Sequence, residues 1–132
     1  MAWDGTATWQ IFKDFFILTL PDFDADAEDS GVFDLRDYLT FIPSHYSLLI
    51  VRAPGLVTVI DASLEGLDHL STSAFAIATV INTTATTGFA GSTTDYTSAT
   101  GKLSEHLFTH IRLTVTTVGA GNTLKAIIIG RR

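Results

Sequence analysis

The sequence predicts an all-β fold: an antiparallel, jelly-roll-like β-sandwich with an N-terminal arm and little helix. Nearly every apolar segment alternates with a period of two and is rich in β-branched and aromatic residues, as strands with one buried face are. Residues that favour turns, mainly Gly, Pro and Asn, separate these segments. No segment keeps a helical period long enough for an α-helix, although one helical turn at residues 34–39 fits the pattern.

The expected strands follow one another along the chain, and two turn signals predict how some of them pair. They cover residues 11–20, 32–36, 46–53, 56–64, 74–81, 110–118 and 124–130. Pro21 is expected to end the first strand, because proline cannot donate a ladder hydrogen bond. Pro54-Gly55 predicts a tight hairpin between the third and fourth strands. The segment Gly119–Asn122 predicts that the last two strands form a hairpin.

The chain length predicts one domain with a distinct N-terminal piece. Its 132 residues suit a single core. We expect residues 1–30 to form an arm, the first strand and an acidic connector, and residues 31–132 to form the sandwich. The low-complexity stretch 82–101 is either a β-rich excursion or a loop ordered by a neighbour.

Several strands are apolar on both faces, among them the runs at residues 48–51 and 127–129. A two-layer sandwich needs only one apolar face per strand. The surplus has two interpretations, which the sequence leaves open. These are ordinary central strands covered by loops, or strands that contact other subunits.

Charge and composition exclude several classes of partner. The net charge of −6 and the isoelectric point near 4.9 disfavour binding to nucleic acid, because phosphate contacts need basic groups. The absence of cysteine excludes disulfides and thiolate chemistry. The N-terminus does not resemble a secretory signal, and the apolar run Phe15–Leu18 is too short to span a membrane. We therefore expect a soluble protein that is made and used without export.

Acidic and histidine residues raise two metal hypotheses. The stretch Asp22–Glu28 resembles the beginning of an EF-hand loop, but Ala27 and Phe33 replace the glycine and glutamate that such a loop needs. A non-standard calcium site and a solvated acidic connector both stay open, and the connector is preferred. His106 and His110 could hold zinc with a third ligand, but histidines on a strand surface are the simpler interpretation. We expect no metal and no cofactor.

Motifs for catalysis are absent from the sequence. It contains no Gly-x-Ser-x-Gly elbow, no glycine-rich phosphate loop and no arrangement of Ser, His and Asp that marks a triad. The prediction is that the protein is not an enzyme and has no catalytic residues.

Three pieces of the sequence carry a resemblance to a known family. They are a strand that ends in the turn Ser63-Leu64-Glu65-Gly66, the strand at 74–81 with its Thr/Gly-rich excursion, and the closing pair at 110–118 and 124–130. The segment Gly31–Tyr38 precedes them. Together they resemble a small β-sandwich module that recurs among virion proteins of tailed bacteriophages. One departure is Leu67-Asp68-His69, where an aromatic residue is commonly expected.

The resemblance implies a structural role in a virion assembled in the host cytoplasm. The expected function is capsid decoration (cement), stabilising the head shell through contacts with the major capsid protein or other virion proteins. The alternatives are a neck or tail accessory protein, or a carbohydrate-binding module of a tail fibre or adsorption apparatus, where Tyr46, Trp3 or Trp9 would stack on sugar. A homo-oligomer is expected, with a trimer preferred. The interface candidates are Trp3, Trp9, Phe89 and Tyr96.

Overall fold

The predicted all-β sandwich is confirmed by the computed structural model, which describes residues 3–52, 60–67, 74–82, 89–95, 108–118 and 123–132. The described residues contain one 3₁₀ helix, η1, and no α-helix. Their elements are β1 (Thr8–Ile11), β2 (Phe15–Phe23), β3 (Glu28–Asp29), β4 (Phe33–Asp34), η1 (Leu35–Asp37), β5 (His45–Arg52), β6 (Ile60–Leu67), β7 (Ala74–Asn82), β8 (Phe89–Asp95), β9 (His110–Thr117) and β10 (Leu124–Arg131).

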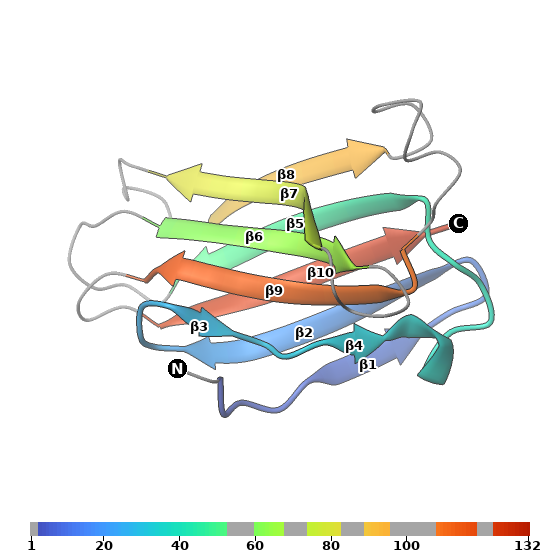
Figure 1. Cartoon of the computed structure of the whole chain (residues 1–132), viewed down its shortest axis with the longest axis horizontal. Helices are drawn as coiled ribbons and strands as arrows, with labels where there is room; N and C mark the ends of the chain where they lie inside the picture. Colours follow the sequence, from blue (N-terminus) through green and yellow to red (C-terminus); the bar gives the residue numbers. More distant parts are fainter. Residues whose placement is uncertain (1–2, 53–59, 68–73, 83–88, 96–107, 119–122) are drawn as a thin grey trace.

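The strands form two antiparallel sheets that lie face to face (Figure 1). Sheet I has the order β1-β2-β10-β5-β8, and sheet II has the order β3-β9-β6-β7, with β4 also paired to β9. Along the chain, most successive connections cross from one sheet to the other. Only β1 to β2, β3 to β4 and β6 to β7 stay within one sheet. This repeated crossing places strands from all parts of the chain in both sheets.

Both hairpins predicted from turn signals are wrong. The strands β9 and β10 exist at the expected residues, but β9 pairs with β6 while β10 pairs with β2 and β5. Likewise β5 lies in sheet I and β6 lies in sheet II. The turn segments themselves lie outside the described residues. Residues that permit a tight reversal also permit a connection between two sheets, so the turn signal does not specify the pairing.

The N-terminal third of the chain belongs to the sandwich. Within the region expected as an arm, β1 pairs with β2, and β2 in turn pairs with β10 at the centre of sheet I. The first predicted strand was placed too early, because residues 12–14 form the turn between β1 and β2. Part of the low-complexity stretch is a strand, since β8 pairs with β5.

Strand β2 passes through Pro21 instead of ending there. The register with β10 shifts between Leu124 and Ala126, which marks a β-bulge in β2 at Pro21 and Asp22, opposite Lys125. Asp22 has φ of 67°, in the left-handed region that Asp tolerates better than most residues. A bulge accommodates the missing N–H of Pro21, so the strand can continue to Phe23.

The core lies between the two sheets and follows the period-two pattern. In sheet I, Leu18 and Ile128 are buried, and in sheet II, Leu64 and Leu113 are buried. The alternate residues of β2, β10 and β9 are more exposed, as expected for one inward and one outward face. The outward residues of the strands therefore make up an outer face on each sheet.

Candidate interaction surfaces

Trp3 is held against the chain's own sandwich. Its ring stacks on Phe23 with centroids 5.2 Å apart and planes inclined by 13°. Its indole Nε1 donates a hydrogen bond of 2.6 Å to the carbonyl oxygen of Pro21, and its backbone N–H donates to the carbonyl of Asp29 at 3.1 Å. The carbonyl of Pro21, which lies at the bulge in β2, therefore accepts a hydrogen bond from the Trp3 side chain.

Trp9, in edge strand β1, is the centre of an aromatic cluster. It stacks on Tyr38 with centroids 4.1 Å apart, and it contacts Phe16 at 5.3 Å and the edge of Phe33 at 5.8 Å. Like Trp3 it is half-buried. Packing on the parent domain thus accounts for part of each tryptophan surface, and a role for either ring in contacting a partner stays a prediction.

The other aromatic candidates lie in different settings. Phe89 pairs with Val51 in the ladder between β8 and β5, but its side chain is not among those described. Tyr96 lies outside the described residues. Tyr46 is buried in the core, with only 2% of its surface exposed, so its ring is not presented to a sugar.

The acidic connector uses its carboxylates to satisfy backbone N–H groups. Glu28 is buried, and its Oε1 accepts hydrogen bonds from the N–H groups of Asp24 and Ala25, at 3.0 and 2.8 Å. Asp26 accepts from the N–H of Val118 at 2.8 Å. These carboxylates fix the β2–β3 connection to the end of β9. Among the described residues, no three His, Asp or Glu side chains are placed to hold a metal.

A charged cluster lies where β4 pairs with β9. Asp34 caps η1 through a hydrogen bond from the N–H of Arg36, and it receives two further hydrogen bonds of 2.9 Å from the Arg36 guanidinium. His110, buried in β9, places Nε2 3.5 Å from Asp34 Oδ2. The Arg36 hydrogen bonds are the main cause that lowers the pKa of Asp34 to about 2, and Asp34 raises the pKa of Arg36.

His110 is thus a packed residue of the sheet, and its Nδ1 lies 2.7 Å from the hydroxyl oxygen of Thr109. His106, the other member of the zinc hypothesis, lies outside the described residues.

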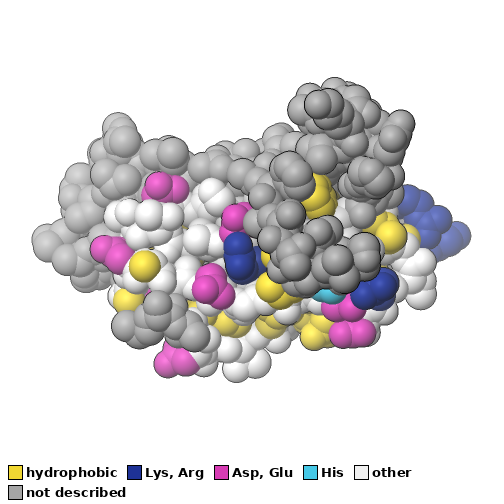
Figure 2. Space-filling view, in the orientation of Figure 1, with side chains coloured by type: hydrophobic (Ala, Val, Ile, Leu, Met, Phe, Trp, Pro, Cys, Tyr) yellow, Lys and Arg dark blue, Asp and Glu magenta, His cyan; other side chains and the backbone are white. Residues whose placement is uncertain are grey.

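The outer face of sheet II is polar. Glu65 of β6 lies opposite Arg112 of β9, and their side chains form an ion pair with a 3.1 Å distance between Oε1 and Nη2. Thr114 donates a hydrogen bond to the same carboxylate. Figure 2 shows the molecule from this side, where charged side chains of both signs lie among other polar and some apolar side chains.

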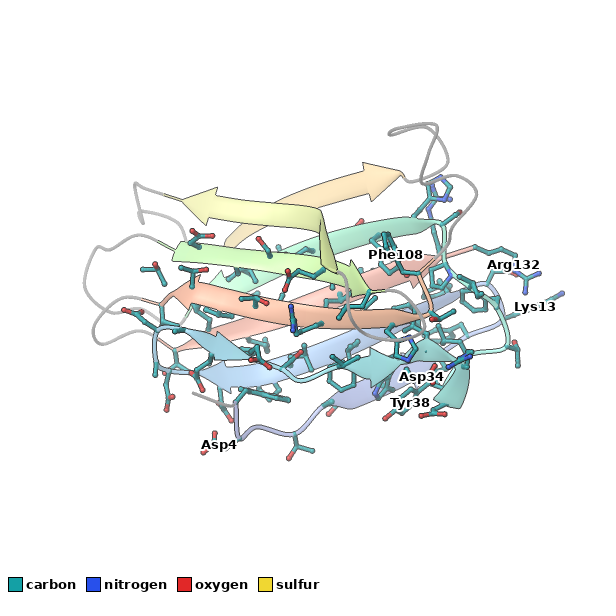
Figure 3. The ribbon with its side chains drawn as sticks, in the orientation of Figure 1. Asp4, Lys13, Asp34, Tyr38, Phe108 and Arg132 are labelled. Carbon is teal, nitrogen blue, oxygen red and sulfur yellow. The ribbon has the colours of Figure 1, made fainter. Side chains whose placement is uncertain are left out.

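Large apolar side chains are exposed at one end of the sandwich. We call this surface the apolar end and define it as Ile11, Phe12, Tyr38 and Ile42, which are between 37% and 47% exposed. Two contacts lie beside these residues: the N–H of Arg132 donates to the carbonyl of Asp14, and the Arg132 guanidinium lies 5.3 Å above the ring of Phe41. Figure 3 shows Tyr38, Lys13 and Arg132 at this end.

Sequence reasoning missed the apolar end because the turn between β1 and β2 has no turn signal. The residues Phe12-Lys13-Asp14 contain no Gly, Pro or Asn, so the strand was extended across them. The N–H of Phe12 donates to the carbonyl of Phe15 at 2.9 Å, and the two rings stack outside the ladder at 4.4 Å. The stacked rings of Phe12 and Phe15 are 47% and 37% exposed, so they form an apolar patch beside the charged turn residues Lys13 and Asp14.

No family model and no curated protein matches the sequence. The described residues contain no helix that is long and apolar enough to cross a membrane.

Several solved structures are similar in fold. The SPBc2 prophage-derived protein YomS is 14% identical with a TM-score of 0.45, over 91% of this chain and 98% of that chain. The CBM22-1–GH10 modules of xylanase 10B from Clostridium thermocellum are 14% identical with a TM-score of 0.47, over 89% of this chain but 22% of that chain. The Glycosylation Associate Protein (Gap123) complex from Streptococcus agalactiae is 7% identical with a TM-score of 0.42, over 97% of this chain and 40% of that chain.

Proposed function

We propose that the chain is a non-enzymatic structural component of a tailed-phage virion, a capsid decoration (cement) protein that stabilises the head shell through contacts with the major capsid protein. The apolar end is the observation that carries the proposal. Its four side chains, from β1, the following turn and the segment after η1, make a surface suited to another protein. The sequence resemblance to virion modules supplies the kind of partner.

The arrangement suits a protein that stabilises its neighbours through the area of its contacts with them. The end surface is built on strands and on a connection held by the stack of Trp9 on Tyr38, so its shape is set before any partner binds. Basic Lys13 and Arg132 lie beside it and can meet carboxylates of a neighbour. Many copies on a shell would add modest contacts into a large total. The proposal places the protein in the virion, after assembly in the host cytoplasm, and includes self-association of the chain.

Particles that lack the chain provide the test. Without it, heads are expected to release DNA at a lower temperature, and added purified protein is expected to restore their stability. The variant Phe12→Lys alters the apolar end and should fail to restore it, whereas Thr116→Lys on the outer face of sheet II should restore it. Both substitutions are at exposed positions, so both proteins should fold. Heads that are equally stable with and without the chain would contradict the proposal.

The adsorption alternative has a separate outcome in the same system. A carbohydrate-binding module would leave head stability unchanged and instead reduce attachment to the host when the chain is removed. The burial of Tyr46 removes one of its three aromatic candidates, and the contacts of Trp3 with Phe23 and of Trp9 with Tyr38 cover part of the other two.

A further inference from the structure

The outer face of sheet I carries apolar side chains on each of its three central strands. Ile127 of β10 lies between Thr19 of β2 and Leu49 of β5, and Ile129 lies between Ile17 and Ser47. Val51 continues the apolar surface along β5. We call this surface the isoleucine face and define it as Ile17, Leu49, Val51, Ile127 and Ile129. Ile129 is 37% exposed and the other four are partly exposed, in contrast to the buried residues that alternate with them.

The outer face of sheet II provides a comparison within the same protein. Its outward positions on β6 and β9 are Asp61, Ser63, Glu65, Arg112, Thr114 and Thr116. None of these is apolar, although both sheets bury similar apolar residues on their inner sides. The described outward positions of β6 and β9 are therefore polar, whereas the centre of sheet I presents apolar side chains outward. The isoleucine face needs a cover that β6 and β9 do not.

We propose that the isoleucine face is covered by the same face of a second copy of this chain, giving a two-fold dimer. Charge supports this occupant. The two central rows of the face run across the strands and contain no charged residue; they are Thr19–Ile127–Leu49 and Ile17–Ile129–Ser47. The cations Lys125 and Arg131 lie at the two ends of β10. Two copies can thus meet at their centres without burying a charge, while the cations stay at the rim in water.

The size of the surface is also sufficient. At ~3.3 Å per residue and ~4.8 Å between strands, three strands of eight or nine residues present a projected area of about 400 Å². Two copies would bury roughly twice that area through these strands alone, and the flanking strands β1 and β8 bring the total toward the ~1,200 Å² at which stable interfaces begin. Sheets commonly pack face to face in this way, with strand directions within about 30° of each other.

This contact is isologous, because each copy contributes the same residues. It therefore builds pairs, and it replaces the trimer preference, which came from the sequence resemblance alone. The inference does not depend on the proposed function, since the dimer forms in solution without a particle.

Sedimentation equilibrium on the purified full chain tests the inference, from low to several hundred micromolar. A mass of twice 14.2 kDa is expected at the upper concentrations. The variant Ile127→Lys puts an ammonium group in the central row and should raise the dimer dissociation constant at least about 30-fold. The milder Ile127→Thr/Ile129→Thr keeps strand preference and should raise it less. The control Thr116→Lys, on the outer face of sheet II, should leave it unchanged.

Circular dichroism and thermal unfolding of each monomeric variant show that it is folded, so that loss of the dimer is not loss of the fold. A wild-type chain that stays at 14.2 kDa throughout would overturn the inference, because the face is then free for a different protein. A trimer, or a dimer that survives Ile127→Lys, would overturn it equally.

Discussion

Replacing Gly130 with alanine should destabilise the protein, although the same change in an open strand would stabilise it. Gly130 lies in β10 between Phe16 of β2 and Tyr46 of β5, and it is buried. A Cβ atom there would lie 2.3 Å from Cε1 and 2.8 Å from Cζ of the Phe16 ring. Such contacts are far inside van der Waals distance, so either the ring or the strand must move.

The Phe16 ring has little room to move. It is fully buried and lies 5.3 Å from the ring of Trp9, measured between centroids. Overpacking of a filled core costs about 1–3 kcal/mol, while removing a glycine from the unfolded chain returns about 0.4–1 kcal/mol. The net expectation for Gly130→Ala is a loss of about 1–2 kcal/mol, which lowers the Tm by roughly 3–10 °C in a domain of this size.

Urea unfolding of a double-mutant cycle measures this effect. Phe16→Leu shortens the side chain that the new methyl group would meet, so Gly130→Ala should cost less in that background, by at least about 0.5 kcal/mol. If Gly130→Ala is as stable as the wild type, or if its cost is unchanged beside Phe16→Leu, the packing explanation is refuted.

Three further predictions concern the buried polar groups and the N-terminus. The low pKa of Asp34, about 2 against its ordinary 3.8, means that its ion pair stabilises the fold above pH 4 and is lost as the pH falls toward 2. The variant Asp34→Asn should therefore reduce the loss of stability between pH 4 and pH 2, and equal pH slopes for the two proteins would argue against it. Glu28→Leu should lower the free energy of unfolding, measured in urea, by about 1–3 kcal/mol, because it leaves the N–H groups of Asp24 and Ala25 unpaired. Glu28→Gln should lower it less, because both hydrogen bonds end on Oε1 and the glutamine amide oxygen can accept them. Trp3→Ala should cost about 2 kcal/mol and Trp3→Phe about half as much, because only Phe keeps the stack on Phe23; equal costs would contradict that division.

Local signals in the sequence located most strands but not their partners. The alternation of Ile111, Leu113 and Val115 predicts β9 correctly, because burying one face requires that pattern in any sandwich. The pattern is the same whether the next strand lies beside it or across the core. Pairing of β10 with β2 joins residues about a hundred positions apart, and no local turn signal contains that information.

Some strands carry more apolar residues than one buried face needs, and this feature of the sequence indicated an interaction surface. The runs at 48–51 and 127–129 were apolar on both faces, and the structure places their outward residues side by side in sheet I. In contrast, the apolar end could not be foreseen, because it brings together Ile11, Tyr38 and Ile42 from segments that meet only after folding. The contacts of Trp3 and Trp9 likewise depend on a bulge and on η1, which tertiary packing determines.

Electron microscopy of the particle tests the central claim most directly. If the chain is a decoration protein, its density should form a regular lattice on the head shell, with the apolar end of each copy against the major capsid protein. Density only at the portal ring or at the distal tail would contradict the proposed function, and so would a head-shell position in which Ile11, Phe12, Tyr38 and Ile42 face the solvent.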